Sequence, residues 1–187
     1  MQRKTATAVA TAVAAAVLVL AFAVAASGKQ GKAFGARLDG YQETPSISTA
    51  GRGRFTAHLQ NGQINYSLTY SGLEGTAAQA HIHFAQQHVA GAIVAWLCGG
   101  GGKAACPASG QITGTIVPAD VVAVLAQGIA GSADFEELIR AMRAGAAYVN
   151  VHSSTYGGGE IRGQINGNAG GGGNGSKGNG NGKKDDD

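Results

Sequence analysis

A tight turn between two alternating segments constrains the fold of this chain more than any other feature. Apolar residues alternate with polar ones through residues 54–59 and again through residues 64–70. Between them stands Asn61-Gly62, a pair that suits a type I′ turn because both central residues of that turn need a positive φ. These residues predict a β-hairpin with one apolar face.

The same alternation, with turn residues at short intervals, continues along most of the chain. Further strands are expected at residues 33–39, 77–84, 91–98, 110–117, 146–152 and 160–166. Short, regularly spaced strands of this kind are typical of a sandwich or a barrel. The sequence therefore predicts an all-β domain, a Greek-key-like β-sandwich or flattened barrel of about eight strands with two short helices.

Two segments carry helical signals. The first begins at Pro118, a residue that fits the first turn of a helix, and is expected to continue through Val121, Val122 and Leu125. The second covers residues 135–142, where apolar residues recur at helical spacing after Asp134, which can act as an N-cap. The second helix is expected to cover one open end of the sandwich.

The ends of the chain differ from the middle. Residues 1–26 have basic residues at the start, an apolar run from Ala12 to Ala26 and small residues at its end, which is the anatomy of a signal peptide. The expected organisation is a signal peptide at 1–26, a linker at 27–32, a β-domain at 33–166 and a disordered Gly/Asn/Lys tail at 167–187. The protein should then be secreted or held in the cell envelope. It would touch a membrane only through an uncleaved signal segment.

The charge and the cysteine content of the chain limit the classes of function that it can have. Residues 33–166 hold seven basic and eight acidic side chains, a net charge of −1, so the basic stripe needed for nucleic-acid binding is not expected. Cys98 and Cys106 flank a Gly- and Ala-rich loop, and an exported chain meets an oxidising environment. A disulfide is the expected state of this pair, with a reactive thiol as the alternative.

Alternation also assigns faces in three of the later strands. Ile82, Val149 and Ile161 are expected to point into the interior, so their polar neighbours should lie on the opposite, outward face. If the strands are neighbours, the residues gathered there are His81, His83, Asn150, His152, Glu160, Arg162 and Gln164.

Two interpretations of this cluster remain open. In the first it is a structural network without a cofactor, in which Glu160 pairs with Arg162 and the histidines hydrogen-bond to the backbones of loops 86–91 and 153–159. In the second His81, His83 and His152 bind Zn²⁺ or Cu²⁺, because His-x-His on a strand presents two ring nitrogens to one point. Arg162 would then be an anion-steering charge.

Two further histidines differ in their relation to this site. His88 lies five residues beyond the His-x-His strand and could supply a fourth ligand, although it stands in a loop. His58 is expected to be an exposed strand residue without a partner.

Several segments together resemble the CHRD family, a domain repeated in chordin and found alone in exported bacterial proteins. The matching segments are residues 38–45, Ala80-His81-Ile82-His83, residues 148–152 and residues 159–164. The resemblance implies an extracellular β-sandwich, which in chordin is part of a protein that binds secreted growth factors. The His-x-His strand and the later histidine are also loosely similar to Cu/Zn superoxide dismutase, another sandwich.

Together these observations give two functional hypotheses. The first is a non-enzymatic extracellular binding or structural module whose loops 85–91 and 153–159 meet an unknown extracellular protein or cell-envelope ligand. The second is a copper- or zinc-binding protein that uses the three histidines and, with copper, could carry out redox chemistry.

Overall fold

The computed structural model describes residues 33–108 and 110–167. The predicted signal peptide and linker, and all of the predicted tail except Gly167, lie outside the described residues. The described residues include the predicted β-domain at 33–166 apart from residue 109.

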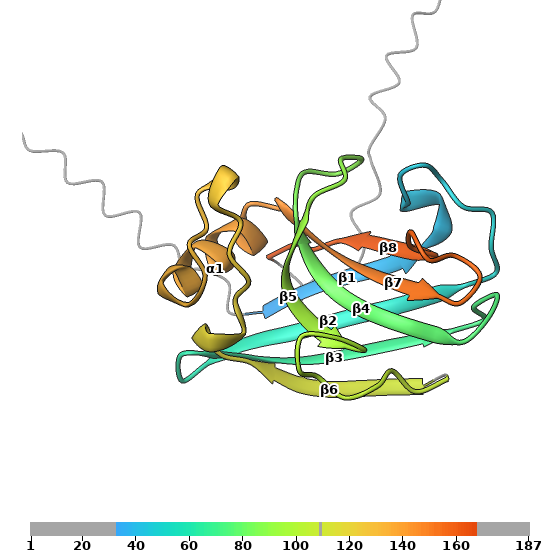
Figure 1. The fold of residues 1–187 in the computed structure, drawn as a ribbon, viewed down its shortest axis with the longest axis horizontal. Coiled ribbons are helices and arrows are strands. Elements are labelled where there is room, and N and C mark those ends of the chain that lie inside the picture. Colours follow the sequence, from blue (N-terminus) through green and yellow to red (C-terminus); the bar gives the residue numbers. More distant parts are fainter. Residues whose placement is uncertain (1–32, 109, 168–187) are drawn as a thin grey trace, which may run out of the picture. The chain divides into compact units, whose positions relative to one another are not determined.

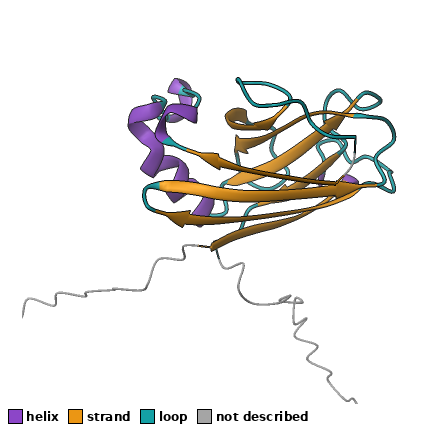
Figure 2. Cartoon of the chain, turned by 90° about the horizontal axis from the view of Figure 1, so that it is seen from below, coloured by secondary structure: helices purple, strands orange, loops and turns teal. Residues whose placement is uncertain are grey.

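Eight antiparallel strands form one sheet, in the order β5-β4-β7-β8-β1-β2-β3-β6. Their bounds are β1 Ala33–Asp39, β2 Arg52–Gln60, β3 Gln63–Ser71, β4 Ala77–Phe84, β5 Ala92–Cys98, β6 Gly110–Ile116, β7 Ala147–Ser153 and β8 Ile161–Gln164. The sheet curls so that β5 and β6, its two edges, come into contact (Figures 1 and 2). The predicted all-β class is confirmed, and the sheet is a nearly closed, barrel-like one.

The hairpin of β2 and β3 has the predicted register. Phe55 pairs with Leu68, and the pairing runs without a break to the residues beside the turn. Asn61 and Gly62 have φ angles of 53° and 73°, as a type I′ turn requires.

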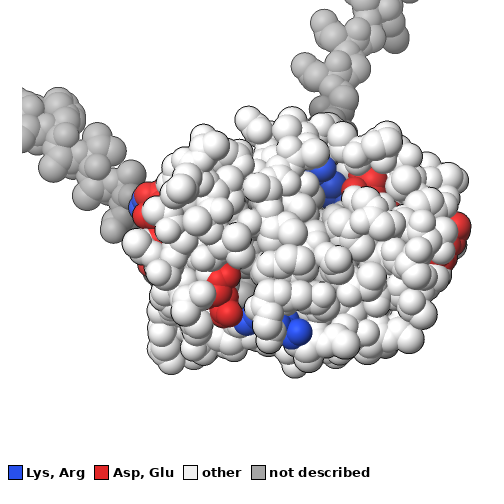
Figure 3. All heavy atoms as spheres, in the orientation of Figure 1, with Lys and Arg blue, Asp and Glu red and all other residues white. Residues whose placement is uncertain are grey.

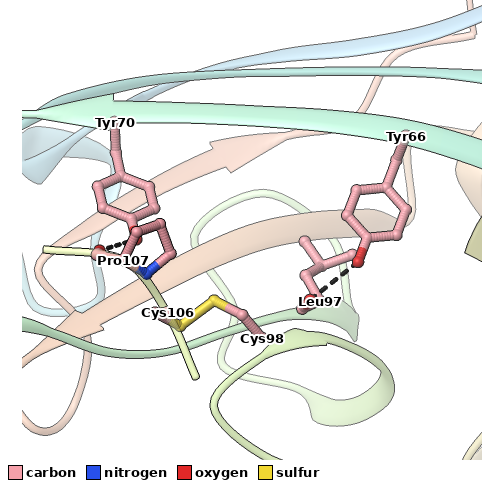
Figure 4. The surroundings of a disulfide bond; sticks show 6 residues. All are labelled: Tyr66, Tyr70, Leu97, Cys98, Cys106 and Pro107. Carbon is pink, nitrogen blue, oxygen red and sulfur yellow. Dashed lines mark hydrogen bonds between the residues drawn. A yellow bond between two sulfur atoms is a disulfide. The ribbon is translucent and has the colours of Figure 1, made fainter. Parts of the chain in front are cut away.

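The two edges of the sheet are joined by side chains and by a covalent link (Figure 4). The hydroxyl of Tyr66 on β3 donates to the carbonyl of Leu97 on β5 at 2.8 Å. Cys98, the last residue of β5, forms the predicted disulfide with Cys106 in the loop before β6. The hydroxyl of Tyr70 donates to the carbonyl of Pro107 in the same loop. These links hold the barrel closed where the described edge strands, β5 and β6, do not pair with each other.

One end of the barrel is covered by α1 (Phe135–Arg143), the one α-helix of the described residues, as predicted for this segment (Figure 1). Leu138, Ile139 and Met142 are fully buried on its inner side. The carboxylate of Asp134 precedes the helix but does not cap it, because it accepts from the amide of Ala130 instead.

The predicted helix after Pro118 is wrong. The segment forms two 3₁₀ turns, η2 (Pro118–Asp120) and η3 (Leu125–Gln127), with extended chain between them. The reason is tertiary: the amide of Val122 donates to the carbonyl of Val94 at 2.9 Å, so this segment pairs with the exposed edge of β5. The other 3₁₀ turns are η1 (Gly40–Gln42) and η4 (Ser132–Asp134). Nowhere in the described part of residues 33–167 is a helix long and apolar enough to cross a membrane.

Candidate metal centre

Strands β4, β7 and β8 are consecutive in the sheet and bring the predicted polar residues onto one face. His81 pairs with Asn150, His83 pairs with Tyr148, and Asn150 pairs with Arg162. The apolar residues between them point the other way, into the core, where Ile82, Val149, Val151 and Ile161 are fully buried. The face assignment made from alternation therefore holds for these strands.

Three imidazoles meet on this face and form what we call the histidine cluster: His81, His83 and His152. One ring nitrogen from each lies within 4.8 Å of the others. The ring centroid of His81 is 4.5 Å from that of His83 and 4.5 Å from that of His152. His-x-His on β4 and the end of β7 thus converge on one point.

Loop carbonyls fix two of the three rings. The Nδ1 atom of His83 lies 2.8 Å from the carbonyl of Gly91, and Nδ1 of His152 lies 2.8 Å from that of Gly157. A carbonyl only accepts, so Nδ1 of each ring carries the proton and donates it. The Nε2 atom of each ring then presents a lone pair.

One nitrogen in each of the three rings has no protein partner within the described residues. Nε2 of His83, Nε2 of His152 and Nδ1 of His81 are all buried, and none of them takes part in a hydrogen bond within the described part of the chain. A buried polar atom without a partner is costly, and three of them at one point call for an explanation.

Burial keeps the rings neutral. Loss of hydration lowers the pKa of His81 to about 3, with further lowering from the neighbouring His83 and His152. The same effect lowers the pKa of His83 to about 4, against the bond to Gly91, and lowers the pKa of His152. Neutral imidazole is the form that binds metal ions, so at neutral pH no proton has to leave these rings.

Aromatic rings support the cluster from two sides. Trp96 on β5 packs edge-on against His81, with ring centroids 4.9 Å apart. Tyr148 stacks on His83 at 4.6 Å and 7°, and the guanidinium of Arg162 lies 3.4 Å from the centroid of the Tyr148 ring. Neither Trp96 nor Tyr148 was predicted to belong to the site, although alternation on β7 places Tyr148 on the same face as His152.

Arg162 is buried, which contradicts its expected role as an anion-steering charge. It is only 2% exposed and donates to the carbonyls of Gln86 and Val89 and to the Thr44 hydroxyl. Its charge is used to hold the loop over β8.

Asn150 has a partner that sequence reasoning missed. Its amide donates to the carboxylate of Glu43, which follows η1 and is nearly buried. Burial raises the pKa of Glu43 to about 7, although the nearby Arg162 and the bond from Asn150 act in the opposite direction. Glu43 lies in the segment at 38–45 that carries the CHRD resemblance, but no pattern in that segment signals a buried carboxylate.

Glu160 and Gln164 belong to the framework around the cluster. Glu160 is fully buried but accepts from the Thr49 hydroxyl and the Glu74 amide, both at 2.7 Å, so the expected pair with Arg162 is wrong. The side chain of Gln164 donates to the carbonyls of Ala85 and Gly145.

The polar face is covered, where the sequence predicted an outward one. His81 is 1% exposed and Asn150 is 3% exposed, because the loops that contact Arg162, His83 and His152 close over the strands. His58 is exposed, as predicted. His88 is also exposed and does not belong to the cluster.

These observations define an antiparallel, barrel-like domain with a buried polar layer on the outer side of three strands. The CHRD domain family profile matches residues 34–165, and the chain belongs to that family. No significant match was found among curated proteins or among solved structures.

Proposed function

We propose that this CHRD domain binds one Zn²⁺ or copper ion through Nδ1 of His81, Nε2 of His83 and Nε2 of His152. The observation that carries the proposal is that each of three convergent imidazoles has one buried ring nitrogen without a partner among the described residues. A bound cation would satisfy all three lone pairs at once. A purely structural network would leave them unsatisfied.

The surroundings of the rings fit a metal site. Histidines that bind a metal donate their other ring N–H to a carbonyl or carboxylate, which fixes the ring and its tautomer. The bonds from His83 to Gly91 and from His152 to Gly157 have this form. Imidazole suits both zinc and copper, so the ligand types alone do not choose between the two ions.

The distances between the ring nitrogens also fit a metal site, provided that the rings move slightly closer together. Zn–N bonds of about 2.0 to 2.1 Å place the nitrogens of a tetrahedral site about 3.4 Å apart. The ring nitrogens here lie within 4.8 Å of one another, so a movement of the rings by about an ångström closes the site. Three protein ligands leave a fourth position for water or another small ligand.

Elemental analysis of the purified full-length or processed protein, after loading with Zn²⁺ or Cu²⁺ and desalting, tests this function. We expect one ion per chain, and we expect a His81→Ala and His83→Ala double variant to lose it. The matched control is a His58→Ala and His88→Ala double variant, which removes two exposed histidines outside the cluster. Absence of stoichiometric metal in the parent protein, or equal metal in the cluster variant, would contradict the proposal.

We also propose that the domain works outside the cytoplasm as an exported module. The signal-like pattern of residues 1–26 and the disulfide between Cys98 and Cys106 support this location. Mass spectrometry of the protein recovered from the medium or envelope should find a chain that begins near Ala26 or Ser27. A chain that keeps Met1 and stays in the cytoplasm would contradict it.

A further inference from the structure

The outer face of β2, β3 and β6 carries a hollow that is unrelated to the histidine cluster. It has a volume of about 430 Å³ and is lined by Arg52, Gly53, Arg54, Thr69, Tyr70, Ser71, Gly110 and Gln111. We call it the arginine hollow. Its side chains come from three neighbouring strands, because Arg54 pairs with Thr69 and Thr69 pairs with Gln111.

The cations at this hollow lack the carboxylate partners that cations have elsewhere. Lys103 pairs with Asp120, Arg140 pairs with Glu137, and Arg162 lies near Glu43. No ion pair within the described residues reaches Arg52 or Arg54. On the face of the molecule shown in Figure 3, charged atoms stand in a few separate groups.

A third arginine increases the local positive charge. Arg37 on β1 lies directly across from Arg54, and like charges in that position destabilise a sheet. Asp39 on β1 lies directly across from Arg52. No ion pair joins the two within the described residues. The Asp39 carboxylate instead accepts from the amides of Tyr41 and Gln42 and from the side chain of Gln42, so it holds the η1 turn. A bound anion would remove this repulsion.

Arg52 is held in place before any ligand arrives. Its guanidinium donates to the carbonyls of Thr49 at 3.1 Å and Gly51 at 2.6 Å. An arginine fixed in this way loses less conformational entropy when it binds, and its planar fork suits a phosphate, sulfate or carboxylate group.

Beyond the hollow, the same face continues as rows of hydroxyl and amide side chains. Thr56, Ser67 and Thr113 form one row across the three strands. The next row along the strands holds His58, Asn65 and Thr115. Such rows can exchange hydrogen bonds with the hydroxyl groups of an extended sugar chain.

We infer that the arginine hollow binds the oxyanion group of an acidic polysaccharide, whose sugar units extend along the hydroxyl and amide rows. The ligand class is a glycan that carries phosphate, sulfate or carboxylate groups. This inference does not depend on the metal site.

The experiment measures binding of the whole protein to four polysaccharides and one polypeptide at a fixed low salt concentration. The probes are phosphorylated dextran, dextran sulfate, polygalacturonate, unmodified dextran and polyglutamate. We expect at least one anionic polysaccharide to bind more tightly than both unmodified dextran and polyglutamate. The one that binds best identifies the oxyanion.

Variants separate the hollow from general electrostatic attraction. An Arg52→Gln and Arg54→Gln double variant should weaken binding about tenfold or more, since hydrogen bonds to charged groups are the strong ones. The control is Arg140→Gln with Arg143→Gln on α1, which removes the same charge and should change binding less than about twofold. The exposed Arg54→Gln single variant, checked by thermal melting, covers the case in which the double variant does not fold.

Three results would overturn the inference. They are no binding to any anionic polysaccharide, equal weakening in the hollow and control variants, and polyglutamate binding as tight as that of the best polysaccharide.

Discussion

The two halves of the sheet share one interior but differ on their outer side. Outside β4, β7 and β8, polar residues such as His81 and Asn150 are buried under loops. Outside β2, β3 and β6, Thr69, Gln111 and Thr113 alternate in the same way but stay open to water to a larger degree. Alternation therefore decides which way a side chain points, while the connecting loops decide whether water reaches it.

Outside β4, β7 and β8, most of the buried polar side chains make hydrogen bonds to the loops that cover them. These bonds replace the ones that the side chains would make with water. Arg162, Gln164 and Asn150 each reach a carbonyl or a carboxylate of a covering segment. Within the described residues, one ring nitrogen of each histidine in the cluster has no such contact, and neither do Oε2 of Glu160 and Oε1 of Gln164. Of these groups, the three imidazoles bring one nitrogen each within 4.8 Å of the others, and this convergence makes the cluster a binding site in our account.

The largest effect on stability is expected for a substitution on the core side of the sheet, compared with one on the exposed outer side of β2, β3 and β6. Val149→Asp should unfold the domain or cost more than about 4 kcal/mol, because it buries an unpaired charge at a fully buried position. Thr113→Asp, on the exposed outer side of β6, should lower the free energy of unfolding by less than about 1 kcal/mol. Urea unfolding monitored by circular dichroism measures both, and equal losses would show that the faces are wrongly assigned.

A smaller effect is expected where the two halves of the sheet meet. Replacing Cys98 and Cys106 by serine should lower stability by about 2 to 3 kcal/mol, the chain-entropy value for so short a loop. The variant should still fold, since the Tyr66 hydroxyl also joins β3 to β5. Denaturant melts of the parent and the variant give the difference. A change below about 0.5 kcal/mol would mean that the disulfide does not stabilise this edge.

The buried titratable groups outside β4, β7 and β8 should make the stability of the metal-free protein depend on pH. The three histidines have lowered pKa values in the fold, so below pH 6.5 the unfolded chain binds more protons and stability falls as pH falls. Glu43 acts in the opposite direction between its ordinary value of 4.5 and its raised pKa of about 7, because there the folded chain binds the extra proton. Since three histidines oppose one carboxyl group, stability measured in chelator from about pH 7 to about pH 4.5 should decline.

Glu43→Gln sharpens that test. The variant removes the opposing contribution, so its stability should decline more steeply than that of the parent over the same pH range. A parallel pair of curves would mean that Glu43 does not hold a proton in the fold. A stability that rises with acidification in both proteins would mean that the histidines are not buried in their neutral form.

The smallest effect on stability is expected for an exposed histidine on the outer side of β2. His58→Ala should change stability by less than about 0.5 kcal/mol, because the side chain is exposed and lies outside the cluster. Thermal melting of His58→Ala beside His152→Ala in metal-loaded protein compares the two halves directly. Only the second variant should lose the stabilisation that bound metal gives.

Much of the fold could be predicted because its signals are local. The turn at Asn61-Gly62, the alternation of the strands and the helical spacing of residues 135–142 each act within a short segment. The helix expected after Pro118 failed because Val122 pairs with β5, a contact between segments far apart in the sequence.

The candidate site was predictable in part for the same reason. Alternation placed His81, His83 and His152 on one face, and that placement needed only the strands. Burial of this face, the support from Trp96 and the buried carboxylate of Glu43 depend on where loops and neighbouring strands settle. Such contacts leave no periodic signal in the sequence.

The most direct test of the central claim is X-ray absorption spectroscopy at the metal edge of protein loaded with one equivalent of Zn²⁺ or Cu²⁺. We predict three imidazole nitrogens in the first coordination shell, at about 2.0 to 2.1 Å for zinc. A shell of oxygen atoms alone, or an unchanged spectrum after replacement of His81, His83 and His152 by alanine, would contradict the account.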